Sequence, residues 1–222
     1  MKVAVIQFPG SNCDRDTVHV LKDVMKLDAE LIWHNEFKDG HYDAVVLPGG
    51  FSFGDHLRGG TIAAHSPATK AVIEMAGEGK PVLGICNGFQ ILIEAGLLPG
   101  ALLRNTSLKF VCKWMNLSID SNKTAFTSSF KKGSKIRMPI AHNEGRFFVD
   151  ETVLDGLEAE GRVVMKYAGE NPTGTSRGIA AISNGKGNVV GMMPHPERAS
   201  EPELGGVDGR RIFESMVEWT RC

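Results

Sequence analysis

A single cysteine, Cys86, stands where a hydrophobic segment stops and a helical pattern begins. The residues Val82–Ile85 are apolar and typical of a strand, whereas those after Cys86 repeat apolar side chains at helical spacing. Gly84 and Gly88 flank the cysteine and would let neighbouring backbone approach in a strained turn. A helix N-terminus favours a thiolate and offers N–H groups to an oxyanion. A lone cysteine is more often a small buried hydrophobic residue, but this arrangement indicates a nucleophile for acyl transfer.

A histidine and a carboxylate follow a second strand-like segment far downstream. His195 and Glu197 lie in the sequence Pro-His-Pro-Glu, directly after the apolar residues 189–193. Because prolines disfavour helix, we expect an extended chain in which Glu197 flanks the imidazole of His195. A carboxylate on one ring nitrogen leaves the other free to exchange protons with a cysteine. The alternative is a surface turn with an incidental histidine, but together with Cys86 these residues predict a catalytic triad.

These motifs resemble the class I glutamine amidotransferases, whose glutaminase domain carries a G-x-C-x-G-x-Q elbow and a late His-Pro-Glu. The matching residues are Cys86, Gln90, His195 and Glu197. The resemblance implies that Cys86 attacks glutamine, that His195 acts as acid and base, that Glu197 orients His195, and that Gln90 shapes the glutamine pocket. It also implies one α/β domain over residues 1–222, of the flavodoxin-like type: an open, mostly parallel sheet flanked by helices, with antiparallel additions.

The same resemblance assigns roles to residues around the nucleophile. The N–H groups of Gly50 and Asn87 are expected to bind the oxyanion of the tetrahedral intermediate, and Gly50 also contacts glutamine. Asn143 and Gly145 match a segment that contacts the backbone carboxylate and amine of the substrate. Arg146 departs from the pattern, because relatives often carry an aromatic residue there.

A glutaminase needs an acceptor for its ammonia, and this chain has no sign of one. The glycine-rich residues 49–60 lack the G-K-[ST] ending of a P-loop, and 222 residues are too few to add an ATP-dependent ligase. We therefore expect no cofactor and no metal in this chain. The resemblance implies a separate large synthetase subunit, with a small third subunit, in which ATP and Mg bind. Low activity is expected from the chain without that partner, since restraint prevents futile hydrolysis.

Three further segments, 8–16, 48–55 and 141–147, resemble one branch of the family, which supplies ammonia to a step of purine biosynthesis. Two alternatives stay open. The first is a glutaminase that serves another synthetase, in the pyridoxal phosphate or histidine pathway. The second is a noncatalytic α/β protein with an elbow cysteine, such as a redox sensor, a chaperone or a binding module.

Charge and cysteine usage exclude several other classes of protein. The formal net charge is −1, from 25 basic and 26 acidic residues, so we expect no nucleic-acid partner. The four cysteines form no C-x-x-C pair, which argues against a zinc knuckle or a disulfide framework and is consistent with the cytoplasm. No apolar stretch approaches the roughly 20 residues that cross a bilayer, and no signal peptide is expected. We therefore expect no membrane association.

Hydrophobic periodicity predicts the elements that must position these residues. Short apolar segments separated by helix-length stretches predict parallel strands: 2–7, 31–33, 44–47 and 82–85. Shorter pieces in the second half predict antiparallel strands: 107–117, 163–167 and 179–182. We expect a hairpin turn over 184–188, an amphipathic closing helix over 211–220, and a first helix whose N-terminal cap region is formed by Asp14 and Asp16.

Overall fold

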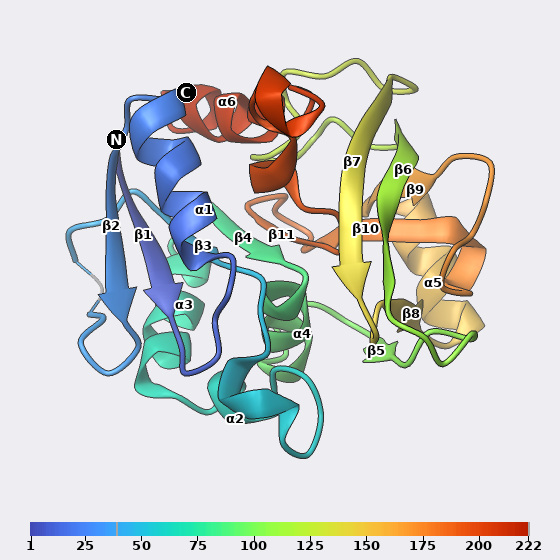
Figure 1. Ribbon diagram of the computed structural model, residues 1–222, viewed down its shortest axis with the longest axis horizontal. Helices are drawn as coiled ribbons and strands as arrows, with labels where there is room; N and C mark the ends of the chain where they lie inside the picture. Colours follow the sequence, from blue (N-terminus) through green and yellow to red (C-terminus); the bar gives the residue numbers. More distant parts are fainter. Residues whose placement is uncertain (39, 222) are drawn as a thin grey trace.

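The computed structural model describes residues 1–38 and 40–221, and within them nine strands form one sheet (Figure 1). Their order is β2-β1-β3-β4-β11-β10-β9-β6-β7. The strands of this sheet are β1 (Lys2–Gln7), β2 (Asp28–Trp33), β3 (Ala44–Leu47), β4 (Val82–Ile85), β6 (Val111–Ile119), β7 (Lys135–His142), β9 (Val163–Tyr167), β10 (Ile179–Ser183) and β11 (Val189–Met192). Two short strands, β5 (Ala101–Leu103) and β8 (Arg146–Phe148), form a separate antiparallel pair.

The first half of the sheet is parallel, as the sequence predicted. Strand β1 pairs in parallel with β2 and β3, and β4 pairs in parallel with β3 and β11. Every residue of β3, β4 and β11 is buried. Strands that are covered on both faces read as continuous apolar segments, which is why these were recognisable.

The second half of the sheet is antiparallel, which confirms the predicted additions. Strand β10 pairs with β11 and β9, and β6 pairs with β9 and β7. The turn between β10 and β11 contains Gly187, at φ +75°, whose N–H donates to the carbonyl of Asn184. Strand β6 begins at Val111, later than expected, because Asn105 and Leu108 close a turn before it.

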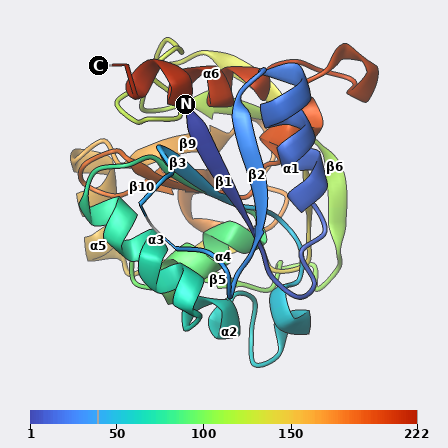
Figure 2. The same ribbon diagram turned by 90° about the vertical axis from the view of Figure 1, so that its left-hand side faces the viewer.

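Helices cover both faces of the parallel half (Figure 2). The helices are α1 (Asp14–His19), α2 (Thr61–Ala64), α3 (Pro67–Gly77), α4 (Asn87–Glu94), α5 (Glu151–Ala159) and α6 (Arg210–Trp219), and a π-helical turn, Val20–Val24, extends α1. In Figure 2, α1 and α6 lie on one side of the parallel strands and α2, α3 and α4 on the other. None of the helices in the described ranges is long and apolar enough to cross a membrane.

Two helices show how the sequence pattern sets the packing. The closing helix α6 buries Ile212, Phe213 and Met216, as its amphipathic pattern predicted. The prediction for the start of α1 was wrong in detail, because the capping position is Cys13 and no side chain makes a capping hydrogen bond there. The carboxylate of Asp14 instead accepts a 2.7 Å hydrogen bond from Gln7, at the end of β1.

Candidate active site

Cys86 lies on a strained turn between β4 and α4. Its backbone has φ +52° and ψ −103°, a region that residues with a Cβ rarely adopt. The flanking glycines are needed for steric reasons. A Cβ on Gly84 would lie 2.6 Å from the carbonyl oxygen of Gly88, and a Cβ on Gly88 would lie 2.0 Å from that of Leu47. The structure thus confirms the tight elbow around Cys86 that the glycine spacing predicted.

The elbow is tied to the strand that leads to the histidine. The N–H of Cys86 donates to the carbonyl of Met192, at the end of β11, over 2.7 Å. The Cys86 thiol faces the carbonyl of Ala141 on β7 at 3.8 Å. Sulfur and histidine therefore meet beyond the carboxyl ends of β4 and β11, where open α/β sheets place their sites.

His195 and Glu197 form a buried pair. The Nδ1 atom of His195 and Oε1 of Glu197 are 2.5 Å apart, and both side chains are almost fully enclosed. The contact arises differently from what the sequence predicted. The chain is not extended throughout, because Pro196–Ala199 forms a 3₁₀ helix that His195 caps, and this turn brings Glu197 back toward the imidazole. Proline favours the first position of such a helix, since its missing N–H is unpaired there in any case.

The pair favours an imidazolium on His195. Burial is the largest single influence on His195 and lowers its pKa, but the charge of Glu197 and the groups around the ring together outweigh it and hold the pKa well above its usual value. The neighbouring sulfurs of Cys13 and Cys86 and the hydrogen bond to Glu197 act in the same direction. The second ring nitrogen, Nε2, has no fixed hydrogen-bond partner among the described residues. His195 is thus equipped to donate a proton to a group that enters the site.

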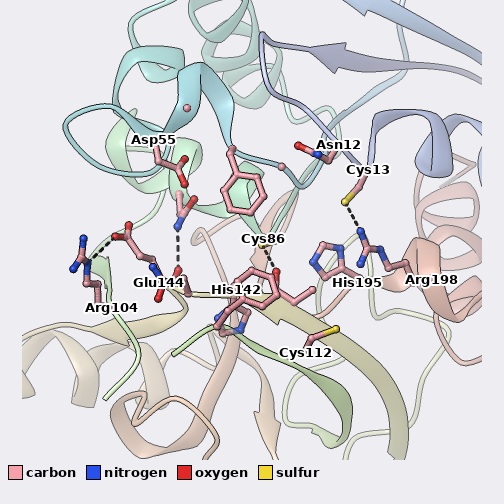
Figure 3. Close-up of a pocket in the computed structure, with 17 residues that line it drawn as sticks. Asn12, Cys13, Asp55, Cys86, Arg104, Cys112, His142, Glu144, His195 and Arg198 are labelled. Atoms are coloured by element: carbon pink, nitrogen blue, oxygen red, sulfur yellow. Dashed lines mark hydrogen bonds and ion pairs between the residues drawn. The ribbon is translucent and has the colours of Figure 1, made fainter. Parts of the chain in front are cut away.

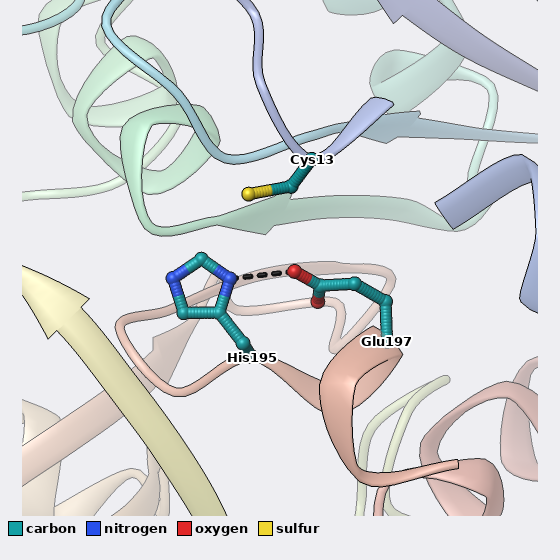
Figure 4. A group of neighbouring side chains, drawn as sticks. All are labelled: Cys13, His195 and Glu197. Atoms are coloured by element: carbon teal, nitrogen blue, oxygen red, sulfur yellow. Dashed lines mark hydrogen bonds and ion pairs between the residues drawn. The ribbon is translucent and has the colours of Figure 1, made fainter. Parts of the chain in front are cut away.

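Cys13 places a second sulfur at this pair, and the sequence analysis predicted no role for it in the site. Its Sγ accepts a 3.0 Å hydrogen bond from Nη2 of Arg198. Ligand-type atoms of Cys13, His195 and Glu197 all lie within 4.8 Å of one another (Figure 4). These residue types bind zinc in proteins. Here, however, the guanidinium of Arg198 donates a hydrogen bond to the sulfur of Cys13 and lies 3.9 Å from the carboxylate of Glu197. The absence of a metal site remains a prediction.

A cavity of about 470 Å³ opens over the nucleophile (Figure 3). The residues with predicted roles that line it are Gly50, Cys86, Gln90, Asn143 and His195. The others are placed differently. Asn87 directly follows Cys86 and begins α4, and Glu197 lies behind His195. Gly145 is buried, with its N–H donated to Oδ1 of Asn105 over 3.1 Å.

Gly50 fits the cavity wall for a backbone reason. It has φ +150°, and a Cβ there would lie 2.7 Å from the N of Asn12 and from the carbonyl oxygen of Gly10. Only glycine allows the segment after β3 to pass so close to the loop after β1. The backbone of this segment is therefore held beside the cysteine elbow.

A chain of side-chain hydrogen bonds connects the loops around the cavity. Oδ1 of Asn87 accepts from the N–H of Ser52 over 3.1 Å, and Nδ2 of Asn87 donates to Oε1 of Gln90 over 2.8 Å. Nε2 of Gln90 then donates to the carbonyl of Glu144 over 3.0 Å. These hydrogen bonds fix the loops after β3 and β7 relative to the elbow. They also hold the amide of Gln90, which forms part of the cavity wall.

Sequence reasoning gave no role to three further charged residues that line the cavity: Asp55, Arg104 and Glu144. Burial, and then the charge of Glu144, raises the pKa of Asp55 to about 6. Nε of Arg104 lies 3.5 Å from the carboxylate of Glu144. Asp55 and Glu144 stand inside segments that the sequence singled out, but nothing in the pattern places them together.

Comparison with known proteins identifies relatives of this chain. Residues 1–220 match the family described as CobB/CobQ-like glutamine amidotransferase domain. The phosphoribosylformylglycinamidine synthase subunit PurQ of Methanosarcina acetivorans is 53% identical, with 99% of this chain and 98% of the relative covered. The PurQ subunit of Trichormus variabilis is 51% identical, with 98% and 97% covered.

A solved structure agrees in fold as well as in sequence. The structure of PurLQS from Thermotoga maritima matches with a TM-score of 0.90 at 44% identity, and 98% of each chain is covered. The predicted fold and the predicted resemblance are therefore confirmed. The chain belongs to the CobB/CobQ-like family of glutamine amidotransferases, in the group that contains these PurQ subunits.

Proposed function

We propose that this chain is the glutaminase subunit of a phosphoribosylformylglycinamidine synthase. It hydrolyses glutamine to glutamate and ammonia, and it passes the ammonia to a synthetase subunit. That subunit uses ATP to amidinate formylglycinamide ribonucleotide in de novo purine biosynthesis. The observation that carries the proposal is the placement of Cys86, on its strained elbow, and of the buried His195–Glu197 pair at one cavity. Full-length identity to PurQ subunits favours this acceptor over those of the pyridoxal phosphate and histidine pathways, and over a noncatalytic role.

The first half of the reaction forms a thioester. The Cys86 thiolate attacks the γ-amide carbon of glutamine, and the N–H groups of Gly50 and Asn87 stabilise the oxyanion. His195 gives its proton to the departing nitrogen, so that ammonia leaves while the carbon–sulfur bond remains. The raised pKa of His195 supports this step, because the imidazolium is the form that can donate.

The second half hydrolyses the thioester. His195, now neutral, takes a proton from water as the water attacks the γ-carbonyl carbon. The carbon–sulfur bond breaks, glutamate leaves and Cys86 returns to the thiolate. Glu197 holds the imidazole in one orientation during both halves and stabilises its charged form.

The chain acts as one domain, residues 1–222, and needs no cofactor of its own. We place ATP and Mg in the large synthetase subunit, with a small third subunit in the assembly, and the assembly in the cytoplasm. Ammonia released into water at neutral pH would mostly become ammonium, which is a poor nucleophile, so a protected route to the synthetase is required. Asn143 and Gly145 remain candidates for contacts to the amino-acid part of glutamine.

The test uses the complex with its synthetase subunits, ATP and formylglycinamide ribonucleotide. The wild-type complex should make product from either glutamine or ammonium chloride, whereas Cys86→Ala should respond to ammonium chloride alone. A Cys86→Ala complex that still used glutamine would contradict the assignment of the nucleophile. A wild-type complex that never used glutamine with this acceptor would contradict the pathway.

A further inference from the structure

Two carboxylates lie in the cavity but take no part in the triad. Asp55 comes from the loop after β3, and Glu144 comes from the loop between β7 and β8. Figure 3 draws them, with Arg104, on the side of the cavity away from His195 and Arg198. The cavity therefore has an acidic end and a catalytic end.

The acidic end is held in place by the surrounding structure. The hydrogen-bond chain from Ser52 through Asn87 and Gln90 to Glu144 fixes both loops relative to the nucleophile. Asp55 itself has φ +53°, in the left-handed region that a residue with a Cβ rarely adopts. Such strain persists only where the surrounding structure enforces it, and it concentrates at ligand sites. The backbone thus holds Asp55 in a costly conformation at the cavity wall.

One carboxylate oxygen at the acidic end lacks a partner within the described part of the chain, and a cation could supply one. Oδ1 of Asp55 is buried and has no hydrogen-bond partner among the residues that the structure describes. Glu144 has Arg104 beside it at 3.5 Å, but its own charge acts against the ionised form of Asp55. A buried carboxylate oxygen normally finds a partner. A positively charged group between Asp55 and Glu144 would supply one.

An independent observation at the other end also points to a ligand in this cavity. His195 is 2% exposed and lines the cavity, and its Nε2 has no partner among the described residues. That nitrogen faces the chemistry at Cys86, so it locates the reacting amide of the substrate. The remainder of the substrate must extend from there through the rest of the cavity.

We propose that Asp55, together with Glu144, binds the α-ammonium group of glutamine, with Arg104 beside the α-carboxylate. The inference rests on the proposed function, because it takes glutamine as the molecule whose γ-amide reaches Cys86. Glutamine carries one cation and one anion at the end remote from its amide. The acidic end offers two carboxylates and one guanidinium, which complements that head group in charge. Charge-assisted hydrogen bonds in an enclosed site are strong and selective. Amides without an α-ammonium group would therefore be poor substrates.

The test compares two alkylating reagents that share one reactive group. The first is a chloroketone analogue of glutamine, which carries the amino-acid head group. The second is chloroacetone, which does not. The rate of modification of Cys86 is followed by mass spectrometry in the complex with the synthetase subunits. The variants are Asp55→Asn and Asp55→Glu, with Glu160→Gln as the matched control, because Glu160 is an exposed carboxylate that pairs with Arg162 outside the cavity.

Asp55→Asn should lower the rate with the glutamine analogue by about 10- to 100-fold, the usual weight of a charge-assisted contact. It should leave the rate with chloroacetone within about twofold, and Asp55→Glu should recover part of the loss. Glu160→Gln should change neither rate. Steady-state kcat/KM for glutamine should fall with the analogue rate, whereas synthesis from ammonium chloride should persist.

Two results would overturn the proposal. An equal loss with both reagents would show that Asp55 only maintains the shape of the site. No loss with either reagent would show that the head group binds elsewhere. In both cases glutamine-dependent synthesis by the wild-type complex would still stand, so the proposed function is tested separately.

Discussion

Replacement of Glu197 by Gln removes one charge from the triad and little else. The 2.5 Å contact to His195 is a charge-assisted hydrogen bond between two buried groups, worth about 1.5–3 kcal/mol. Without the carboxylate, burial, which is already the largest single influence, is opposed less, and the pKa of His195 falls. Even one unit of change adds about 1.4 kcal/mol to the cost of the proton-donating form. Because this pKa change arises from the same contact, the two figures are not added, and a loss of about 1.5–3 kcal/mol corresponds to a roughly 10- to 150-fold fall in kcat/KM.

The assay is glutamine hydrolysis by the complex across a range of pH. In the wild-type enzyme the raised pKa of His195 keeps the proton donor populated as pH rises through neutrality. In Glu197→Gln the alkaline limb of the profile should move to lower pH, and synthesis from ammonium chloride should be unaffected. Glu78→Gln, at an exposed site, is the control. A fall of less than about tenfold, or an unmoved limb, would refute the reasoning.

Three further predictions concern the elbow, the cavity and the partner. Gly88→Ala would place a Cβ 2.0 Å from the carbonyl oxygen of Leu47, so we expect a loss of more than about 3 kcal/mol in the free energy of unfolding, measured by denaturant titration. Asp55→Asn should stabilise the free chain by about 1 kcal/mol at pH 8, because the rise in pKa from 3.8 to about 6 corresponds to roughly 3 kcal/mol before screening at this half-buried site. That gain should shrink as pH falls from about 6 and vanish below about 4, where the carboxyl is protonated whether the chain is folded or unfolded; a gain that is independent of pH would contradict it. The isolated chain should hydrolyse glutamine far more slowly than the complex, and equal rates in a direct glutamate assay would exclude restraint by the partner.

The sequence was sufficient for the features that are local in the chain. The elbow at Cys86 could be read because strand, glycine spacing and helix are contiguous around it. The parallel strands could be read because β3, β4 and β11 are buried on both faces and are therefore continuously apolar. The pairing of His195 with Glu197 followed from motif and chemistry, but the 3₁₀ turn that creates it did not.

The features that the sequence missed depend on long-range packing. Asp55 and Glu144 are far apart in the chain and meet only because the loops after β3 and β7 reach the same edge of the sheet. No role was predicted for Cys13, but the loop after β1 carries it to Arg198 and the catalytic pair. One clue was available: charged residues stood inside two of the segments that resembled the family. Only the register of the strands could show that they share a cavity.

The central claim is that Cys86 carries a γ-glutamyl group during turnover, and acid quenching tests it most directly. The complex is mixed with isotope-labelled glutamine, quenched in acid within the first turnovers, digested and examined by mass spectrometry. We predict a labelled γ-glutamyl thioester on the peptide that contains Cys86, which disappears on longer incubation and does not form in Cys86→Ala. Glutamate release at the full rate, with label on another residue or on none, would contradict the account.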